Sequence, residues 1–234
     1  MDTTLLFSGG VDSALAAVLL AEQFDRVRLV TYDHGWWSGH FRLGKADRRA
    51  RDIRRALGAS RIAYARVPLG ALFHRFVTAT LVEDRRRFGT NTCCVGCKLA
   101  MHTRTVLFNL RHGIGHAADG SAADQAFHAE QLTGVLAGIR RLYHRYDIYY
   151  ANPSFAIDTR ERQARLQQAG LEPEGVQPRC LFGAYDFFIH ARLHVAHHEE
   201  EDAMVAYMAH KLPLAFTIID RAIADEGLHA PRPT

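Results

Sequence analysis

The feature that most constrains the fold of this 234-residue chain is a glycine turn close to its N-terminus, Ser8-Gly9-Gly10-Val11-Asp12-Ser13. A short apolar run, Thr3 to Phe7, leads into the turn, and Ala and Leu recur at helical spacing from Asp12 to Gln23. This order predicts a strand, a tight turn and a helix. Backbone N–H groups at the start of such a helix bind anions, and phosphate groups in particular.

Strand and helix patterns alternate after this turn. Further strands are predicted at 27–32, 62–67 and 113–118, and helices at 47–57, 72–86 and 99–110. Such alternation favours the α/β class, with a doubly wound parallel sheet covered on both faces. Ligands of these sheets bind beyond the carboxyl ends of the strands. The loops at 8–13, 33–35 and 119–124 follow strands one, two and four, so they are predicted to share one site.

The remainder of the chain is predicted to be mostly helical. Candidate helices are 125–145, 158–169, 199–210 and 213–224, and Asp158 with Glu161 forms a capping-box pattern at the start of one of them. We therefore expect a nucleotide-binding domain at 1–150 and a mainly helical C-terminal region at 151–234.

The composition indicates the compartment of the protein and the partners that it can have. No apolar run approaches the roughly 20 residues that span a bilayer, and the N-terminus lacks a secretory pattern, so a cytoplasmic protein without a membrane partner is expected. A net charge of +4 permits a nucleic-acid partner without requiring one. Three arginine groups either follow an RNA backbone or form solvated helix faces: Arg48/Arg49/Arg51/Arg54/Arg55, Arg85 to Arg87, and Arg140/Arg141/Arg145.

The phosphate-binding interpretation of the turn assigns roles to its residues. Gly9 and Gly10 permit close approach, Ser8 and Ser13 add hydroxyl donors, and Asp12 is a candidate Mg²⁺ ligand. The lysine of the Walker pattern is absent. The alternative is an ordinary strand-to-helix turn with Ser and Asp as caps.

The whole string SGGVDS between a strand and an Ala/Leu helix resembles the signature loop of the PP-loop ATP pyrophosphatases. The resemblance implies that ATP is split into AMP and pyrophosphate while a substrate is adenylated. Asp33-His34-Gly35 is similar to the adenosine-side loop of that family, which implies that main-chain groups near Tyr32 and Asp33 meet the adenine. Taken alone, Asp-His-Gly is only a turn signal.

The cysteines suggest a second kind of chemistry. Three of the four lie within five positions, at Cys93, Cys94 and Cys97, and the fourth is Cys180. In a reducing compartment such clustering indicates a metal or redox site rather than a disulfide framework. We favour Cys94, Cys97 and Cys180 as ligands of a 4Fe–4S cluster with one iron open to sulfide. A structural Zn²⁺ site that adds Cys93, unliganded thiols, and a sulfur-donating cysteine without a cluster are the alternatives.

Three motifs occur in the order seen in LarE-like sulfur transferases: Cys94-Val95-Gly96-Cys97-Lys98, the loop Ala118-Asp119-Gly120-Ser121-Ala122-Ala123-Asp124, and Pro178-Arg179-Cys180-Leu181. The match implies roles for Gly120 and Ser121 in the nucleotide site. Some members of that family, and the PP-loop tRNA 2-thiolation enzymes, are similar in holding a cluster with three cysteines. The chain departs from the pattern where Ser121-Ala122 replaces Thr-Asn and Ala123 replaces an Asp.

Together these patterns predict an ATP-dependent sulfur transferase that adenylates a substrate oxygen and replaces it with sulfur. Its catalytic candidates are Asp12, Lys98, Cys97 and Cys180. Lys98 either neutralises an adenylated intermediate or is a solvated lysine at a helix start. The sulfur acceptor is a small molecule or tRNA, and the sulfur source is sulfide or a cysteine desulfurase. A ligase with structural zinc and a non-catalytic nucleotide-binding or redox-sensing protein are the rival functions. The sequence leaves open whether the chain forms a homo-oligomer.

Overall fold

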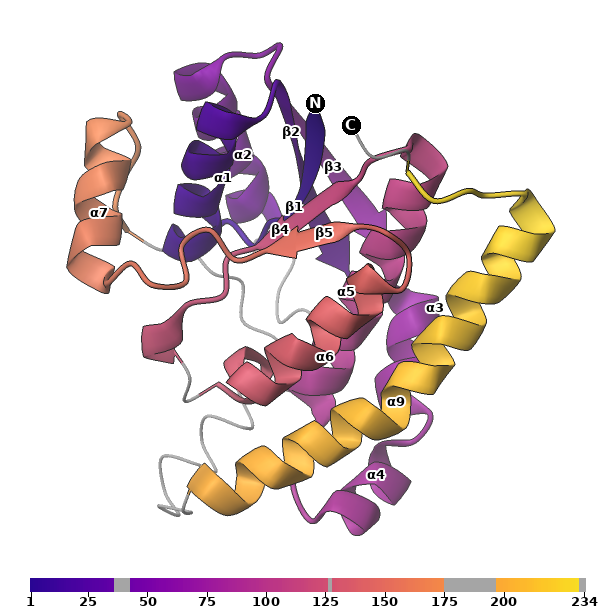
Figure 1. Ribbon diagram of the computed structural model, residues 1–234. Coiled ribbons are helices and arrows are strands. Elements are labelled where there is room, and N and C mark those ends of the chain that lie inside the picture. The colour runs from indigo at the N-terminus through magenta and orange to yellow at the C-terminus, as the bar shows by residue number, and fades with distance from the viewer. Residues whose placement is uncertain (36–42, 126–127, 175–196, 232–234) are drawn as a thin grey trace.

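The fold is built on one parallel sheet. The computed structural model describes residues 1–35, 43–125, 128–174 and 197–231 (Figure 1). Five parallel strands run in the order β3-β2-β1-β4-β5. Their bounds are β1 (Asp2–Leu6), β2 (Arg26–Asp33), β3 (Ile62–Pro68), β4 (His116–Asp119) and β5 (Tyr149–Ala151). The predicted doubly wound α/β class is confirmed.

The two faces of the sheet carry different helices. Alternate side chains of a strand point to opposite faces, and Leu5 and Leu6 of β1 accordingly belong to separate apolar clusters. α1 (Val11–Gln23) and α2 (Leu43–Leu57) cover one face, and α7 (Thr159–Gln168) packs outside α1. α5 (Cys93–His112) and α6 (Thr133–His144) cover the other (Figure 1).

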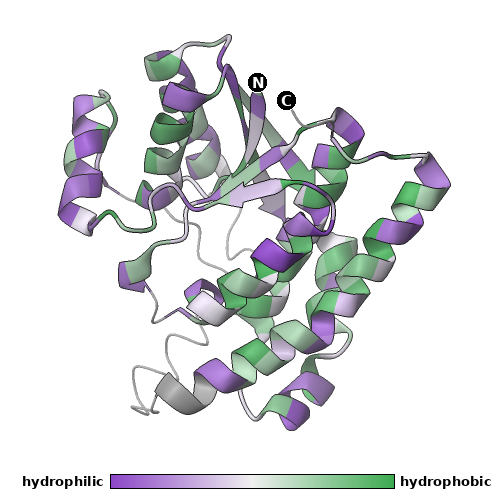
Figure 2. Ribbon diagram, viewed as in Figure 1, coloured by the Kyte–Doolittle hydropathy of each residue, from purple (hydrophilic) through white to green (hydrophobic). Residues whose placement is uncertain are grey.

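A long helix packs on the side of α5 and α6 that faces away from the sheet. α9 (His197–Glu226) runs unbroken through Pro213, so the prediction of two separate helices was wrong (Figure 1). Its apolar residues continue at helical spacing on both sides of the proline, as the hydropathy colours of Figure 2 show, and the buried ones belong to the same core as α5 and α6. Burial of that stripe offsets the one backbone hydrogen bond that proline removes. α6 permits the close approach with glycines, since a Cβ at Gly138 would lie 2.4 Å from Met208 Cγ.

Two other predicted helices are broken in the structure. The predicted helix 72–86 consists of α3 (Gly70–Phe73), a π-helical turn η1 (His74–Thr78) and α4 (Leu81–Phe88). The interruption at Ala79-Thr80 places Thr80 Oγ1 2.7 Å from both Asp84 Oδ2 and Lys211 Nζ, within a buried ion pair that joins α4 to α9.

The predicted helix 125–145 likewise divides, into η2 (Ala123–Gln125), η3 (Ala129–Gln131) and α6. The first strand of the C-terminal half, β5, was not predicted because three residues are too short for a period-two pattern. The proposed boundary at residue 150 lies within this strand. Among the described residues, no helix is long and apolar enough to cross a bilayer.

Candidate active site

The glycine turn adopts the geometry that an anion site needs. Gly9 has a φ of +81°, and a Cβ there would lie 2.9 Å from the Cα of Ala46, so both the torsion and the close contact require glycine. Gly10 is the N-cap of α1 and makes no side-chain cap bond. Ser8 Oγ and Ser13 Oγ lie 3.1 Å apart and brace the turn from within. The N–H groups at the start of α1 are therefore presented by a rigid loop.

A second loop packs directly on this turn. β4 lies beside β1 in the sheet, and Gly120 follows it. A Cβ on Gly120 would lie 2.6 Å from the backbone nitrogen of Ser13, so only glycine permits the contact. Since β1 has β2 on one side and β4 on the other, the two loops meet at the topological switch point of the sheet.

A cavity of about 240 Å³ opens at this point. It brings together most of the residues predicted for the site, from two loops, the strand β2 and the helices α1 and α5. Those that line it are Ser8, Asp12, Ser13, Tyr32, Cys94, Cys97, Lys98, Gly120 and Ser121. The predicted convergence on one site thus holds in space. Met101 and His102 also line it and were not predicted. Cys93, the added ligand of the alternative zinc site, and Asp119, which opens the predicted loop 119–124, line it as well.

Lys98 and Asp119 form a buried ion pair at the floor of the cavity. Their closest N···O distance is 2.9 Å, and the two side chains are 6% and 8% exposed. Lys98 Nζ also donates to Ser121 Oγ at 2.7 Å. Burial alone raises the pKa of Asp119, but the charge of Lys98 and the contact with His102 outweigh it and hold that pKa well below its usual range. Asp119 is therefore a permanent anion that fixes the ammonium group of Lys98.

His102 supports this pair from behind. Its Nε2 lies 3.3 Å from Asp119 Oδ2, and its Nδ1 shares a 2.9 Å hydrogen bond with the hydroxyl of Tyr143. Burial lowers the pKa of His102 although Asp119 opposes the shift, so the ring is neutral near pH 7. Asn152 donates to the other oxygen of Asp119 at 2.6 Å. Both carboxylate oxygens are thereby fixed in direction.

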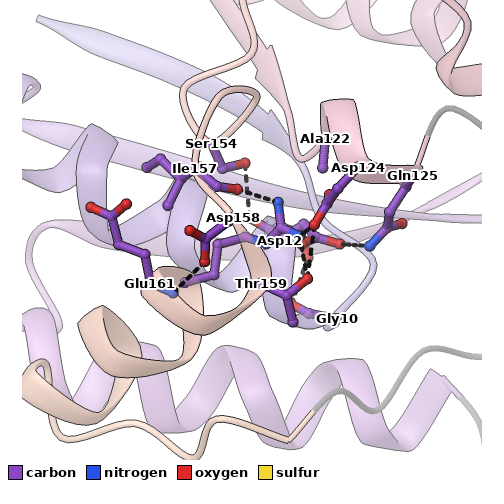
Figure 3. A network of polar contacts seen from close by, with 12 residues as sticks. Gly10, Asp12, Ala122, Asp124, Gln125, Ser154, Ile157, Asp158, Thr159 and Glu161 are labelled. Atoms are coloured by element: carbon purple, nitrogen blue, oxygen red, sulfur yellow. Dashed lines mark hydrogen bonds and ion pairs between the residues drawn. The ribbon is translucent and has the colours of Figure 1, made fainter.

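A separate network holds Asp12, as Figure 3 shows. Arg162 of α7, 1% exposed, places its Nε 2.9 Å from Asp12 Oδ1, and Gln125 donates to Asp12 Oδ2 at 2.9 Å. The guanidinium also contacts Asp124 and donates to the carbonyl oxygen of Ile157 at 2.6 Å. The predicted N-cap of α7 is confirmed, since Asp158 accepts from the backbone N–H of Glu161 at 2.9 Å. α7 is thereby fixed to the phosphate loop.

The cysteines stand on a helix rather than in a loop before one. The sequence placed the start of this helix at Leu99, whereas α5 begins at Cys93. Cys94 and Cys97 are three positions apart on its first turn, and both line the cavity. Cys180 lies outside the described residues. Among those residues, no group of three or more His, Cys, Asp or Glu side chains is arranged to hold a metal.

The opposite end of the cavity is apolar and aromatic. Tyr32 is buried, and its hydroxyl shares a 2.7 Å hydrogen bond with Thr105 Oγ1. His34 stacks on Phe73 with ring centroids 4.7 Å apart, and burial lowers its pKa to about 4. Asp33 does not line the cavity, and its carboxylate accepts from the N–H of Gly35. This end of the cavity has the neutral, flat surfaces that suit a nucleotide base.

Comparison with known families identifies the loop. A family model described as the tRNA methyl transferase HUP domain matches residues 1–138. The chain belongs to this PP-loop family. The PP-loop resemblance of the glycine turn is therefore confirmed, and with it ATP as the nucleotide of a transferase at the level of the family. No curated protein matches the chain.

The fold also occurs in a solved structure. The chain is similar to a 4-thiouridine synthetase determined with RNA and bound ATP, at 16% identity and a TM-score of 0.52, over 87% of this chain and 53% of that one. It thus spans about half the length of the synthetase. A predicted subunit of tRNA methyltransferase from Methanocaldococcus jannaschii matches at 16% identity and a TM-score of 0.45, over 77% of this chain and 96% of that one.

Proposed function

We propose that this protein is an ATP-dependent RNA sulfurtransferase, which adenylates a base oxygen of tRNA and replaces it with sulfur. The observation that carries the proposal is the shared cavity: the phosphate loop, Lys98 and the thiols of Cys94 and Cys97 line one space. A phosphate site alone suits any nucleotide chemistry, whereas a pair of cysteines facing it adds sulfur chemistry. The bound RNA and ATP of the 4-thiouridine synthetase structure support the choice of substrates.

The first step uses the phosphate side of the cavity. The carbonyl oxygen of the base attacks the α-phosphorus of ATP, the bond to the β-phosphate oxygen breaks, and pyrophosphate leaves. The N–H groups of the turn and the hydroxyls of Ser8 and Ser13 hold the phosphates, and the ammonium of Lys98 stabilises negative charge on the α-phosphate. Gly120 and Ser121 close the wall beside them.

Mg²⁺ would neutralise the phosphates at the Asp12 end of the loop. A carboxylate offers about four lone-pair sites. Asp12 uses one lone pair of each oxygen for Arg162 and Gln125, so a metal-ligand role is compatible with these contacts. Such an ion would add positive charge to that of Lys98, which Asp119 partly balances, and of Arg162, which Asp12 and Asp124 balance.

The second step exchanges oxygen for sulfur. A hydrosulfide ion attacks the activated carbon, AMP leaves with the original oxygen, and loss of one proton gives the thiocarbonyl. If the sulfur arrives instead as a persulfide on Cys94 or Cys97, the other thiol releases the product by forming a disulfide, which an external thiol then reduces. Hydrosulfide itself or a cysteine desulfurase is the source in the two cases.

A 4Fe–4S cluster is a third form in which sulfur is held. Cys94 and Cys97 have suitable spacing for two thiolate ligands on one helical turn, but the described residues do not contain a third ligand beside them. A cluster therefore requires Cys180, and when bound it would offer an open iron for sulfide. The described residues support the two-cysteine site directly and the cluster only with that addition.

The test is a reaction of the anaerobically purified protein with ATP, tRNA and labelled sulfide. We expect pyrophosphate release that depends on tRNA, and label in the RNA. When a cysteine desulfurase with labelled cysteine replaces the sulfide, Cys94→Ser and Cys97→Ser should lose sulfur transfer by about 100-fold or more, because the persulfide route needs both thiols. Both variants should retain pyrophosphate release, because adenylation needs neither thiol. Cys93→Ser is the matched control and should keep both. Iron and sulfide analysis of the same preparation decides between cluster and thiol. Absence of tRNA-dependent pyrophosphate release would contradict the proposal.

A further inference from the structure

The segment 74–92 between α3 and α5, which contains η1 and α4, connects two residues that line the cavity. Phe73, at the end of α3, lines the cavity, and so does Cys93, at the start of α5. Between them, η1 and α4 extend beyond the carboxyl edge of the sheet, and α4 lies at the end of the molecule toward which the strands run (Figure 1). Both ends of this segment therefore lie at the cavity.

The exposed charge on this segment is strongly positive. Arg75 on η1 and Arg85, Arg86 and Arg87 on α4 are all exposed, whereas Glu83 is its one exposed acidic residue. The other acid, Asp84, is 3% exposed and is neutralised by Lys211 of α9 at 2.9 Å. The charge of Asp84 is thus balanced by Lys211 and not by an arginine of α4.

The α2 and α6 groups each combine paired and unpaired arginines, whereas all three arginines of α4 lack an ion pair with the described residues. On α2, Arg49 is buried and donates to the carbonyl oxygen of Glu174, and Arg55 pairs with Asp52. On α6, Arg145 pairs with Asp220, and Arg140 donates to Asn152. Arg85, Arg86 and Arg87 form no ion pair with any described residue.

The α4 arginines are also held in place. Arg87 lies with its Cζ 5.6 Å from the centroid of the Phe88 ring, and that ring packs edge-on against Tyr207. Arg86 and Arg87 border a surface hollow that residues 78–83 complete. A guanidinium group binds a phosphate through two parallel hydrogen bonds. A cluster of arginines therefore suits a phosphodiester backbone, which presents one phosphate after another.

We propose that the α4 arginines, Arg85, Arg86 and Arg87, with Arg75 beside them, are the surface on which the phosphate backbone of the RNA substrate docks. The inference rests on the proposed function for the choice of RNA, and the segment that carries the patch begins and ends at residues that line the cavity, Phe73 and Cys93. It also selects one of the three arginine groups as the RNA contact and leaves the α2 and α6 groups as helix faces.

The experiment measures tRNA affinity over a range of NaCl concentrations for the parent protein and for R85Q/R86Q/R87Q. The matched control is R51Q/R54Q/R55Q, which removes the same charge from the part of α2 that ends at the opposite edge of the sheet. We expect the α4 variant to bind tRNA about tenfold or more weakly at moderate salt, and the slope of log affinity against log salt to fall by about 2. The control should lose less than about threefold, the general effect of net charge.

ATP affinity and the thermal unfolding midpoint of both variants should equal those of the parent, because none of the substituted arginines lines the cavity. Equal tRNA affinity of the α4 variant and the parent, or equal losses in both variants, would overturn the inference. A parent that does not bind tRNA, or one whose α4 surface captures anionic vesicles in place of tRNA, would overturn it as well. Failure of the proposed function gives a different result: tRNA binds through α4, but no pyrophosphate or sulfur transfer depends on it.

Discussion

At the residue scale, Lys98 has two partners and two separable effects. It neutralises Asp119, and it presents its ammonium group to the cavity. Loss of the positive charge leaves a buried carboxylate without its counter-ion, which costs about 3–5 kcal/mol of folding free energy. Loss of charge stabilisation at the reacting phosphate slows the reaction by about 100-fold or more. A single substitution changes both quantities at once.

We predict that Lys98→Gln lowers both the unfolding free energy and the rate of tRNA-dependent pyrophosphate release. The double variant Lys98→Gln/Asp119→Asn should recover most of the stability, because no unpaired charge remains, and should stay about 100-fold slow. Urea unfolding and a pyrophosphate assay measure the two effects. Recovery of activity in the double variant would mean that Lys98 serves only to balance Asp119.

Sequence reasoning reached the residues of local motifs and missed their distant partners. Ser8 to Ser13 and Gly120 were predictable because a glycine turn directly after a strand is a pattern of a few consecutive residues. Asp119 was recognisable only as part of a loop, since its role depends on His102 and Asn152. The role of Arg162 was not predictable at all, because nothing in a polar helix such as α7 marks one arginine as buried against the phosphate loop.

At the element scale, the position of α5 decides where the thiols lie. The helix starts at Cys93 instead of Leu99, so the cysteines share one rigid turn with Lys98. Sequence placed the start late because cysteine and glycine are weak helix formers. Tertiary contacts override that weakness: Gly96 lies against α9, and the hydroxyl of Tyr207 donates to the carbonyl oxygen of Phe76 beside it at 2.8 Å.

Gly96→Ala tests this contact. A Cβ at position 96 would lie 2.5 Å from the hydroxyl oxygen of Tyr207 and 3.1 Å from the carbonyl oxygen of Phe76. We expect a loss of about 1–3 kcal/mol from overpacking, seen as a thermal midpoint lower by about 3–10 °C. Sulfur transfer should fall more than pyrophosphate release, because the turn that carries the thiols moves.

Two matched variants separate packing from helix propensity. Gly44→Ala, on α2 with no atom within 4 Å of the new Cβ, should be neutral or slightly stabilising. Gly96→Ala/Tyr207→Phe removes the obstructing hydroxyl and should regain part of the loss. A Gly96→Ala protein as stable as the parent would show that α9 moves to accept the methyl group without cost.

At the scale of the whole molecule, α7 joins the C-terminal half of the chain to the nucleotide site. Arg162 contacts Asp12 on α1 and Asp124 after β4, so the phosphate loop, the loop at the switch point and α7 share one side chain. The helical C-terminal region was predictable from its periodicity. Its connection to the phosphate loop was not, because amphipathic patterns give the face that a helix buries and leave open what it is buried against.

Because Arg162 connects α7 to the phosphate loop, we expect it to affect how strongly ATP stabilises the protein. A ligand at about 100 times its Kd adds about 2.7 kcal/mol, which raises the thermal midpoint of a chain of this size by about 5–10 °C. Arg162→Lys keeps the charge, but a lysine cannot reach Asp12, Asp124 and the carbonyl oxygen of Ile157 together. We expect the variant to have a lower thermal midpoint without nucleotide. We also expect ATP to raise its midpoint by only about half as much as in the parent. Arg165→Lys, one turn along α7 on the exposed Glu161 pair, is the matched control and should change neither value. If Arg162→Lys lowers the midpoint but leaves the ATP increment intact, α7 stabilises the fold without ordering the phosphate loop, and Asp12 holds its position by other contacts.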